Sequence, residues 1–210
     1  MRPTRLFLEG PGGQGKTTLL LKNMGALRMN AGGFVVRRLL DPEGKIRGFS
    51  LSSPGASDEA SLPFAKSAEN VFLERTESGV AQRLHVLEEG MLSLLDGCEH
   101  RKLIVVDEFG GIELLLPKIR ARLAEILSAR VPCIGVFKSR DNAKNMAETL
   151  DLPSEYFRRY NELRARIVED FQAELLFFDS RTRRETEEAV ASFCCGLQAG
   201  VPEHPSETRG

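Results

Sequence analysis

The sequence has little of what marks membrane proteins, secreted proteins or general nucleic-acid binders. None of its apolar runs approaches the length that a bilayer-spanning helix needs, and the opening "MRPTRLFLEG" lacks the long apolar stretch of a signal peptide. Its 29 Lys and Arg residues almost balance its 30 Asp and Glu residues, so the net charge is −1. This balance gives no general attraction to nucleic acid or to an anionic membrane, although it leaves a local basic patch open. We therefore expect neither a membrane nor a nucleic acid as partner.

Cysteine is also scarce, and the four thiols follow no recognisable pattern. The spacings of Cys98, Cys133, Cys194 and Cys195 match no zinc-ligand motif, and the adjacent pair at 194–195 cannot easily form an ordinary disulfide. Reduced thiols are usual in the cytoplasm, which is the location we expect.

What is present indicates one ordinary domain. Hydrophobic residues make up 41% of the chain and charged residues 28%, which is typical of a globular protein, and 210 residues suit one domain with an insertion. We predict a single domain over residues 1–198. The polar segment 199–210 contains Pro and Gly and is expected to be a disordered tail.

Apolar strands alternate with amphipathic helices along the chain, without an internal repeat. We expect strands at 4–10, 102–108, 131–138 and 173–180, and helices at 16–32, 79–97, 116–130, 154–171 and 183–197. The expected inward faces of two of these helices are Leu84, Leu87, Met91 and Leu95, and Ile119, Leu123, Ile126 and Leu127. Two β-rich runs around "DPEG" predict a hairpin at about 34–51, followed by a loop at 52–68. The alternation predicts an α/β fold with a mostly parallel sheet, helices on both faces and an inserted β-hairpin.

The stretch "GPGGQGKTT" fits the phosphate-loop pattern G-x-x-x-x-G-K-[ST]. Glycines allow successive backbone N–H groups to point at a triphosphate, and the N-terminus of the following helix favours an anion. A lysine at position 16 would add charge at the β- and γ-phosphates, and a threonine hydroxyl at position 17 could ligate Mg²⁺. The predicted nucleotide-binding residues of the loop are Gly10, Pro11, Gly12, Gly13, Gln14, Gly15, Lys16, Thr17 and Thr18. Because the motif falls between an expected strand and an expected helix, we predict a P-loop NTPase.

The apolar run "LIVV" leads directly into two carboxylates, Asp107 and Glu108. Acids at a strand end are often no more than solvated surface residues. Beside a phosphate loop, however, an acid in this position can hold Mg²⁺. We therefore predict Asp107 and Thr17 as metal ligands. Glu108 would point to the other side of the strand end, where it could activate a water for attack on the γ-phosphate, so we name Lys16 and Glu108 as catalytic residues.

These motifs, in this order, resemble the small nucleoside-triphosphatase family of the cancer-related type. The resemblance covers roughly residues 5–190 and also uses "AGGF" at 31–34, "RGF" at 47–49, "VVDEFGGIE" at 105–113 and the arginine-rich turn after the last strand. It implies a P-loop α/β fold and Mg²⁺-dependent hydrolysis of ATP, GTP and other nucleotides.

The chain departs from the family around the site rather than in the phosphate loop. The family's second acidic motif usually reads D-E-I-G-x-M-E. Here Asp107, Glu108, Gly110 and Glu113 match, Phe109 and Ile112 replace Ile and Met, and Gly111 stands where Lys is usual. The segment "VVRR" at 35–38 follows "GGF", where the family tends to carry Thr and Glu. These differences bear on substrate choice and rate, not on the expected fold.

Three functions therefore compete. The first is a nucleoside triphosphatase that hydrolyses ATP or GTP to the diphosphate and phosphate. The second is a kinase that passes the γ-phosphate to a nucleotide or other small molecule, with Arg37, Arg38 and Arg47 of the hairpin meeting phosphate. The third is a nucleotide-dependent switch or accessory protein with little turnover, for which the apolar Phe109 and Ile112 beside the site would suit a protein partner. Phosphate release without an acceptor separates the first from the others.

Two further arginines are candidates for the site. Arg140, in "FKSRDN" after an expected strand, could reach the phosphates as an arginine finger supplied by the chain itself, and it is the third catalytic candidate beside Lys16 and Glu108. Resemblance to the family, which carries an Asn-Arg pair after its last strand, aligns Arg184 with the Arg of that pair. A guanidinium can stack on either purine, so we expect weak discrimination between ATP and GTP. The alternative is that Arg181, Arg183 and Arg184 only solvate the start of the last helix.

Overall fold

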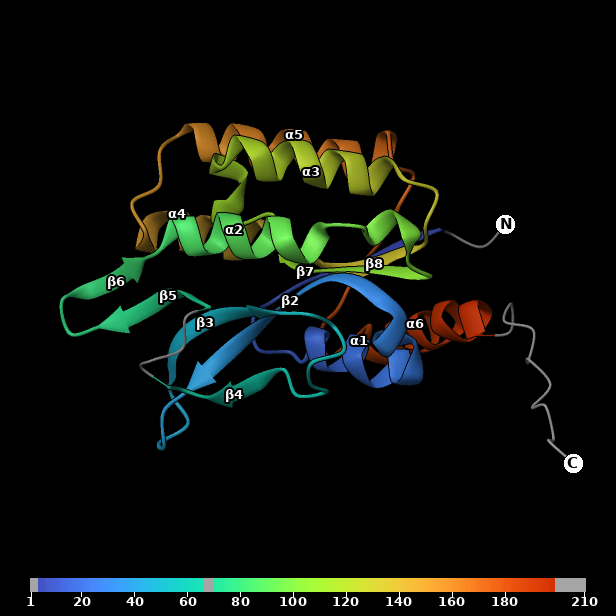
Figure 1. Cartoon of the computed structure of the whole chain (residues 1–210), viewed down its shortest axis with the longest axis horizontal. Helices are drawn as coiled ribbons and strands as arrows, with labels where there is room; N and C mark the ends of the chain where they lie inside the picture. Colours follow the sequence, from blue (N-terminus) through green and yellow to red (C-terminus); the bar gives the residue numbers. More distant parts are fainter. Residues whose placement is uncertain (1–3, 66–69, 199–210) are drawn as a thin grey trace, which may run out of the picture.

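A computed structural model of the chain describes residues 4–65 and 70–198. A central sheet separates two layers of helices (Figure 1). Helices α2, α3, α4 and α5 cover one face, while α1 and α6 cover the other. Their bounds are Lys16–Met24 for α1, Leu84–Leu95 for α2, Pro117–Ser128 for α3, Arg140–Thr149 for α4, Glu155–Glu169 for α5 and Arg183–Gln198 for α6. The predicted α/β architecture is confirmed.

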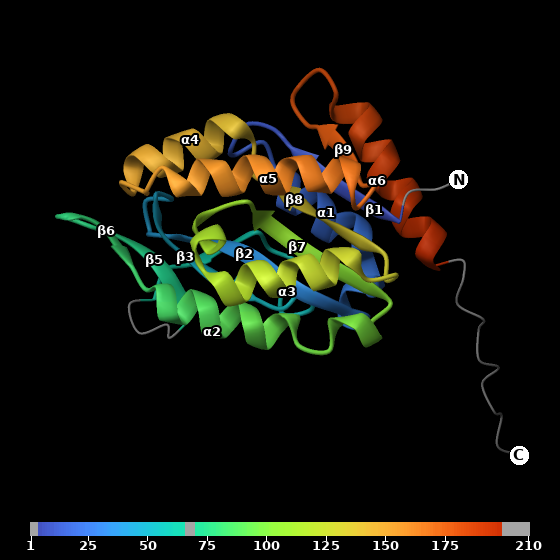
Figure 2. The same cartoon turned by 90° about the horizontal axis from the view of Figure 1, so that it is seen from above.

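The sheet joins a parallel half to an antiparallel half. The strand order is β6-β5-β3-β2-β7-β8-β1-β9, and β4 pairs with β2. Strands β2, β7, β8, β1 and β9 are parallel, whereas β3, β5 and β6 run antiparallel to their neighbours. The bounds are Arg5–Glu9 (β1), Ala31–Leu40 (β2), Ile46–Ser52 (β3), Ser61–Pro63 (β4), Val71–Thr76 (β5), Gly79–Gln82 (β6), Leu103–Phe109 (β7), Cys133–Phe137 (β8) and Glu174–Phe177 (β9). Figure 2 shows that β5 and β6 project beyond the helices at one edge.

Side chains alternate across the central strands and supply two separate cores. Phe7 and Val106 pack with α2, α3 and α5 on one face, whereas Leu8 and Val105 pack with α1 and α6 on the other. All four of these side chains are buried. This pattern explains why the strands are apolar along their whole length, as expected for a parallel sheet covered on both faces. The predicted inward face of α3 is buried as well.

The helix expected at 79–97 begins later in the structure than predicted. Residues Gly79–Gln82 form β6, which pairs with β5, and the helix begins only at Leu84. Leu84, placed on the inward face by its spacing, is 36% exposed, while Leu87, Met91 and Leu95 are buried as expected. Pairing between strands close in sequence here outweighs the helical pattern of the residues that follow. Strand β5 was not expected from the sequence at all.

The predicted hairpin exists, but it is not a separate insertion. Strand β2 begins at Ala31, and its first residues pair with β7 in the parallel sheet before its later residues pair with β3. The hairpin is therefore a continuation of a central strand. The segment 52–68, expected to be loop, contains β4 at Ser61–Pro63; its last residues, 66–68, lie outside the described part of the chain.

Three other elements differ from expectation. The first helix ends at Met24, because Gly25 adopts a φ of 49°, and a 3₁₀ turn over Gly25–Asn30 leads into β2. Helix α4 replaces the loop expected after β8. Strand β9, expected to be buried, is an edge strand in which Phe177 is 48% exposed.

The predicted tail at 199–210 lies outside the described residues, and the domain limits remain a prediction. Among the helices that the structure describes, none is long and apolar enough to cross a membrane.

Candidate active site

The phosphate-loop motif connects β1 to the N-terminus of α1. Gly10 opens the loop in a conformation with φ 141°, and a Cβ there would lie 2.3 Å from the backbone oxygen of Phe178. The amine of Lys16 donates hydrogen bonds to the backbone oxygens of Gly10 (3.0 Å) and Pro11 (2.6 Å), so its side chain folds back over the loop. The N-cap residue of α1 is Gly15, which has no side chain to cap the helix. Its first N–H groups are therefore available to an anion.

Thr17 and Asp107 meet beside this loop, although they are far apart in sequence. The Thr17 hydroxyl lies 3.0 Å and 3.2 Å from the two carboxylate oxygens of Asp107. The backbone N–H of Val36 also donates to Asp107, which is only 1% exposed. Burial, reinforced by the charge of Glu108, raises the pKa of Asp107 to about 7.

This pair fits a magnesium ion. Hydroxyl and carboxylate oxygens are the ligands that Mg²⁺ prefers, and Mg²⁺ usually takes only one or two protein ligands beside phosphates and water. A divalent cation here would also favour the ionised form of the buried Asp107 carboxylate. Within the described part of the chain, no group of three or more His, Cys, Asp and Glu side chains could hold a metal. The Thr17 hydroxyl and the Asp107 carboxylate could supply protein oxygens to a Mg²⁺ ion.

A break in the pairing of β7 sets the direction of Glu108. Val106 pairs with Gly135 and Phe109 with Phe137, so Asp107 and Glu108 together oppose the single residue Val136. Glu108 sits in this bulge with a φ of 56°, a conformation that is strained for a residue other than glycine. Such strain is typical of functional positions. The consequence is that Asp107 and Glu108 both face the phosphate-loop end of the sheet.

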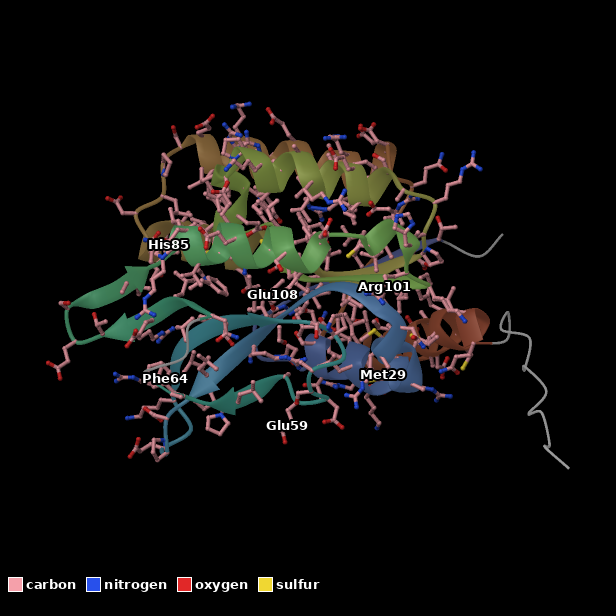
Figure 3. The ribbon with its side chains drawn as sticks, in the orientation of Figure 1. Met29, Glu59, Phe64, His85, Arg101 and Glu108 are labelled. Atoms are coloured by element: carbon pink, nitrogen blue, oxygen red, sulfur yellow. The ribbon has the colours of Figure 1, made fainter. Side chains whose placement is uncertain are left out.

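Glu108 forms an ion pair with Lys138, which follows β8. The amine and carboxylate are 3.1 Å apart. Burial opposes ionisation of Glu108, but the charges of Lys138 and Lys16 hold its pKa below the ordinary value. Burial likewise favours the neutral amine of Lys138, yet Glu108 raises its pKa. Figure 3 places Glu108 near the centre of the molecule.

The phosphate loop, Glu108 and Lys138 line one end of a large cleft. Its volume is about 1030 Å³, at the upper end of the range for small-molecule sites. The rest of the cleft is lined by residues of β2, β3, β4, β5, β6, α2, α4 and the 3₁₀ turn at Ile112–Leu115. This geometry brings the glycine-rich loop, Thr17 and the Glu108 carboxylate together in a single cleft, and Asp107 lies directly behind Thr17.

Comparison with known proteins places the chain in a family. A family model described as NTPase matches residues 5–169. The chain belongs to this NTPase family. The resemblance inferred from the motifs is therefore confirmed, and with it the expectation of a nucleoside-triphosphate hydrolase.

Individual relatives support this assignment. The nucleoside-triphosphatase THEP1 of Thermotoga petrophila is 31% identical over 139 residues, which cover 64% of this chain and 72% of that protein. The protein of the same name from Thermotoga maritima is 30% identical over 139 residues, covering 64% of this chain and 74% of that protein.

Two solved structures have the same fold. THEP1 from Aquifex aeolicus has a TM-score of 0.57 at 19% identity, over 90% of this chain and 98% of that chain. A human cancer-related nucleoside triphosphatase has a TM-score of 0.56 at 16% identity, over 94% of this chain and 99% of that chain. At these identities the likeness concerns the fold.

The structure places the predicted arginines of this NTPase outside the cleft. Arg140 is exposed at the start of α4 and does not line the cleft. Arg184 has a 91% exposed side chain that pairs with Glu188 at 2.9 Å. Its neighbour Arg183 approaches the phosphate loop more closely, since it donates to the backbone oxygen of Gln14 at 3.1 Å.

Two cations in the cleft were not assigned to hydrolysis from the sequence. Lys138 directly follows an apolar strand, and this position at a strand end was the one feature that could have marked it as a site residue. The sequence does not show which group its amine would pair with. From the sequence, Arg38 was considered only as a phosphate contact in the kinase alternative. It is half-buried in the cleft, and its charge acts to lower the pKa of both Lys16 and Glu108. A Cβ at Gly111 would lie 2.8 Å from a carboxylate oxygen of Glu113 and 3.2 Å from the Lys138 side chain, so glycine leaves room for both.

Glu113 is predicted to stabilise the loop that follows the acids. Its carboxylate accepts hydrogen bonds from the backbone N–H groups of Gly110 (2.6 Å) and Gly111 (2.8 Å), and it is 3% exposed. Replacing it with alanine leaves both donors without this acceptor, at roughly 1–3 kcal/mol each. We expect Glu113→Ala to lower the free energy of unfolding in urea by that order. Glu113→Gln keeps an acceptor oxygen and should lose less; equal losses for both variants would contradict this role.

Proposed function

We propose that the protein hydrolyses ATP and GTP to the diphosphate and phosphate in the presence of Mg²⁺. Gly10 to Thr18 bind the phosphates, and Lys16 contacts the β- and γ-phosphates. Glu108 accepts a proton from the attacking water. The observation that carries the proposal is the contact between the Thr17 hydroxyl and Asp107, because it joins the phosphate loop to the strand-end acids at 3.0 Å.

The roles of the two acids follow from their surroundings. Asp107 contacts the phosphate-loop threonine and is closed off from solvent, which suits a metal ligand. Glu108 lines the cleft, and the charges of Lys138 and Lys16 favour its ionised form, so its carboxylate oxygens are acceptors for a water in the cleft. Thr17 and Asp107 would hold Mg²⁺, which would supply positive charge to the triphosphate when bound.

The direct test is phosphate release by the purified chain. With MgATP or MgGTP and no added acceptor, we expect one phosphate per nucleoside diphosphate formed. Omission of Mg²⁺ should stop the reaction. Tight nucleotide binding without release would favour a switch, and release that requires an added alcohol would favour a kinase.

We further propose that the base lies towards β9 and is recognised weakly. The phosphate loop follows β1, and β9 is the neighbour of β1 on the side away from the acids. Arg184 is exposed there and could cover either purine ring. Because stacking reads no hydrogen-bond pattern, ATP and GTP should compete with similar affinities.

Arg38 is the arginine that we expect to assist hydrolysis. It lines the cleft with Lys16 and Glu108, whereas Arg140, the arginine suggested by the sequence, is exposed on α4. Arg38→Ala should slow phosphate release about tenfold, equal to roughly 1.4 kcal/mol of transition-state stabilisation. Arg140→Ala is the matched comparison and should stay near the wild-type rate. If Arg140→Ala slowed steady-state phosphate release more than Arg38→Ala does, Arg140 would be the arginine that assists hydrolysis.

We also propose a cytoplasmic location. Cys98, Cys133, Cys194 and Cys195 are all free thiols, and burial raises the pKa of Cys133. Thiols kept in this state are usual in a reducing compartment.

A further inference from the structure

The part of the cleft beyond the acids is apolar and has no role in the hydrolysis proposed above. We define this distal pocket by six side chains from four elements: Phe49, Phe72, Leu73, Val80, Leu87 and Met91. Met146 of α4 and Leu150, which follows this helix, line the same cleft. The side-chain amide of Gln82 lies 3.5 Å from the backbone oxygen of Leu150, so β6 lies near the C-terminal end of α4.

The sheet order separates this pocket from the place of the base. Strands β3, β5 and β6 lie on the far side of β7 from β1, whereas β9 lies next to β1 on its other side. The γ-phosphate end of a nucleotide points towards Asp107 and Glu108 at the end of β7. A nucleotide bound in that direction carries its base towards β9. The distal pocket therefore remains open next to the γ-phosphate.

The charges around the distal pocket favour an anion. Its acids already have partners: Glu74 pairs with Arg83 at 2.9 Å, and Glu108 pairs with Lys138 at 3.1 Å. Two arginines, Arg38 and Arg75, also line the cleft. Within residues 4–65 and 70–198, neither of their side chains makes a hydrogen bond or an ion pair with the protein.

We propose that the distal pocket binds a second small molecule, an organic anion with a flat or branched apolar body, while the nucleotide occupies the phosphate loop. The apolar walls would contact the body of this molecule, and Arg75 would contact its anionic group. Met91 and Met146 suit this use, because methionine side chains adapt to ligands of different shape. The inference rests on the proposed position of the γ-phosphate and adds a second ligand to the same cleft.

The test uses 8-anilinonaphthalene-1-sulfonate, an aromatic anion whose fluorescence rises in apolar surroundings. Purified protein is titrated with this probe alone and with saturating Mg²⁺ and a non-hydrolysable ATP analogue. We expect one saturable site that is retained when the analogue is bound. Displacement of the probe by the analogue would overturn the inference, because the pocket would then belong to the nucleotide.

Methionine methyl signals locate the probe without any mutation in the pocket. In protein labelled with ¹³C at the methionine methyl groups, the signals of Met91 and Met146 should shift on probe binding. Met24, which is buried, and Met29, which is 66% exposed, lie outside the cleft lining and should not shift. Shifts confined to Met29, or no shifts at all, would mean non-specific binding and would overturn the proposal.

Variants of the pocket test its apolar lining, and a neutral probe tests its preference for anions. Leu73→Glu and Val80→Glu place a carboxylate at two half-buried positions of the pocket and should weaken probe binding at least about tenfold. Leu62→Glu, on β4 and outside the cleft lining, is the matched control and should bind normally. The neutral analogue N-phenyl-1-naphthylamine should bind about tenfold more weakly than the sulfonate. Equal binding by all variants, or by both probes, would contradict the proposed pocket or its preference for anions.

Phosphate release measured on the same samples separates this inference from the proposed hydrolysis. Leu73→Glu and Val80→Glu should keep the wild-type rate. Hydrolysis without probe binding would overturn only the second-ligand site. Probe binding without hydrolysis would overturn only the proposed reaction.

Discussion

Lys16→Ala is expected to abolish phosphate release and to weaken triphosphate binding. The Lys16 amine donates hydrogen bonds to the backbone oxygens of Gly10 and Pro11, in the loop where a triphosphate would bind. Burial lowers its pKa, while the nearby charge of Glu108 acts in the opposite direction. A phosphate oxygen would replace these backbone contacts with a charge-assisted hydrogen bond, which is worth about 1.5–3 kcal/mol.

Calorimetry with a non-hydrolysable ATP analogue measures this loss directly. Lys22→Ala is the matched control, because Lys22 lies in the same helix but is exposed. It should bind and hydrolyse as the wild type does. If Lys16→Ala retained the wild-type affinity and turnover, the assignment of the phosphate loop would be wrong.

The phosphate loop and the acids could be predicted because both depend on short stretches of sequence. The motif at 10–18 requires only local backbone geometry, and the apolar run before Asp107 identifies a buried strand end. Both Thr17 and Asp107 were predicted as metal ligands, and the structure brings them together, with the Thr17 hydroxyl 3.0 Å from the Asp107 carboxylate. Their role as metal ligands remains a prediction.

Contacts that depend on register or long-range pairing could not be predicted. Lys138 meets Glu108 only because β8 lies beside β7 and a bulge turns Glu108 out of the regular pattern. Strand β6 was missed because its residues were assigned to the helix that begins only at Leu84, and β5 was missed because its pairing with β3 and β6 is not visible in a short stretch of sequence. The distal pocket depends on both, since it is formed where these strands approach α4.

Glu108→Gln is expected to bind MgATP normally but to slow its hydrolysis by roughly 10²–10⁴-fold, the usual contribution of a positioned general base. Glutamine preserves the size of the side chain and can still accept a hydrogen bond from Lys138, so the strained bulge at φ 56° should persist. What it loses is the negative charge that accepts a proton from water. Asp107→Asn should differ, because a weaker metal ligand raises the Mg²⁺ concentration needed for half-maximal activity. Glu89→Gln, an exposed acid on α2, controls for the loss of one charge. Phosphate release over a range of Mg²⁺ concentrations separates these effects. A wild-type rate for Glu108→Gln would reduce this carboxylate to a structural partner of Lys138, and the activation of water would have to come from another group in the cleft.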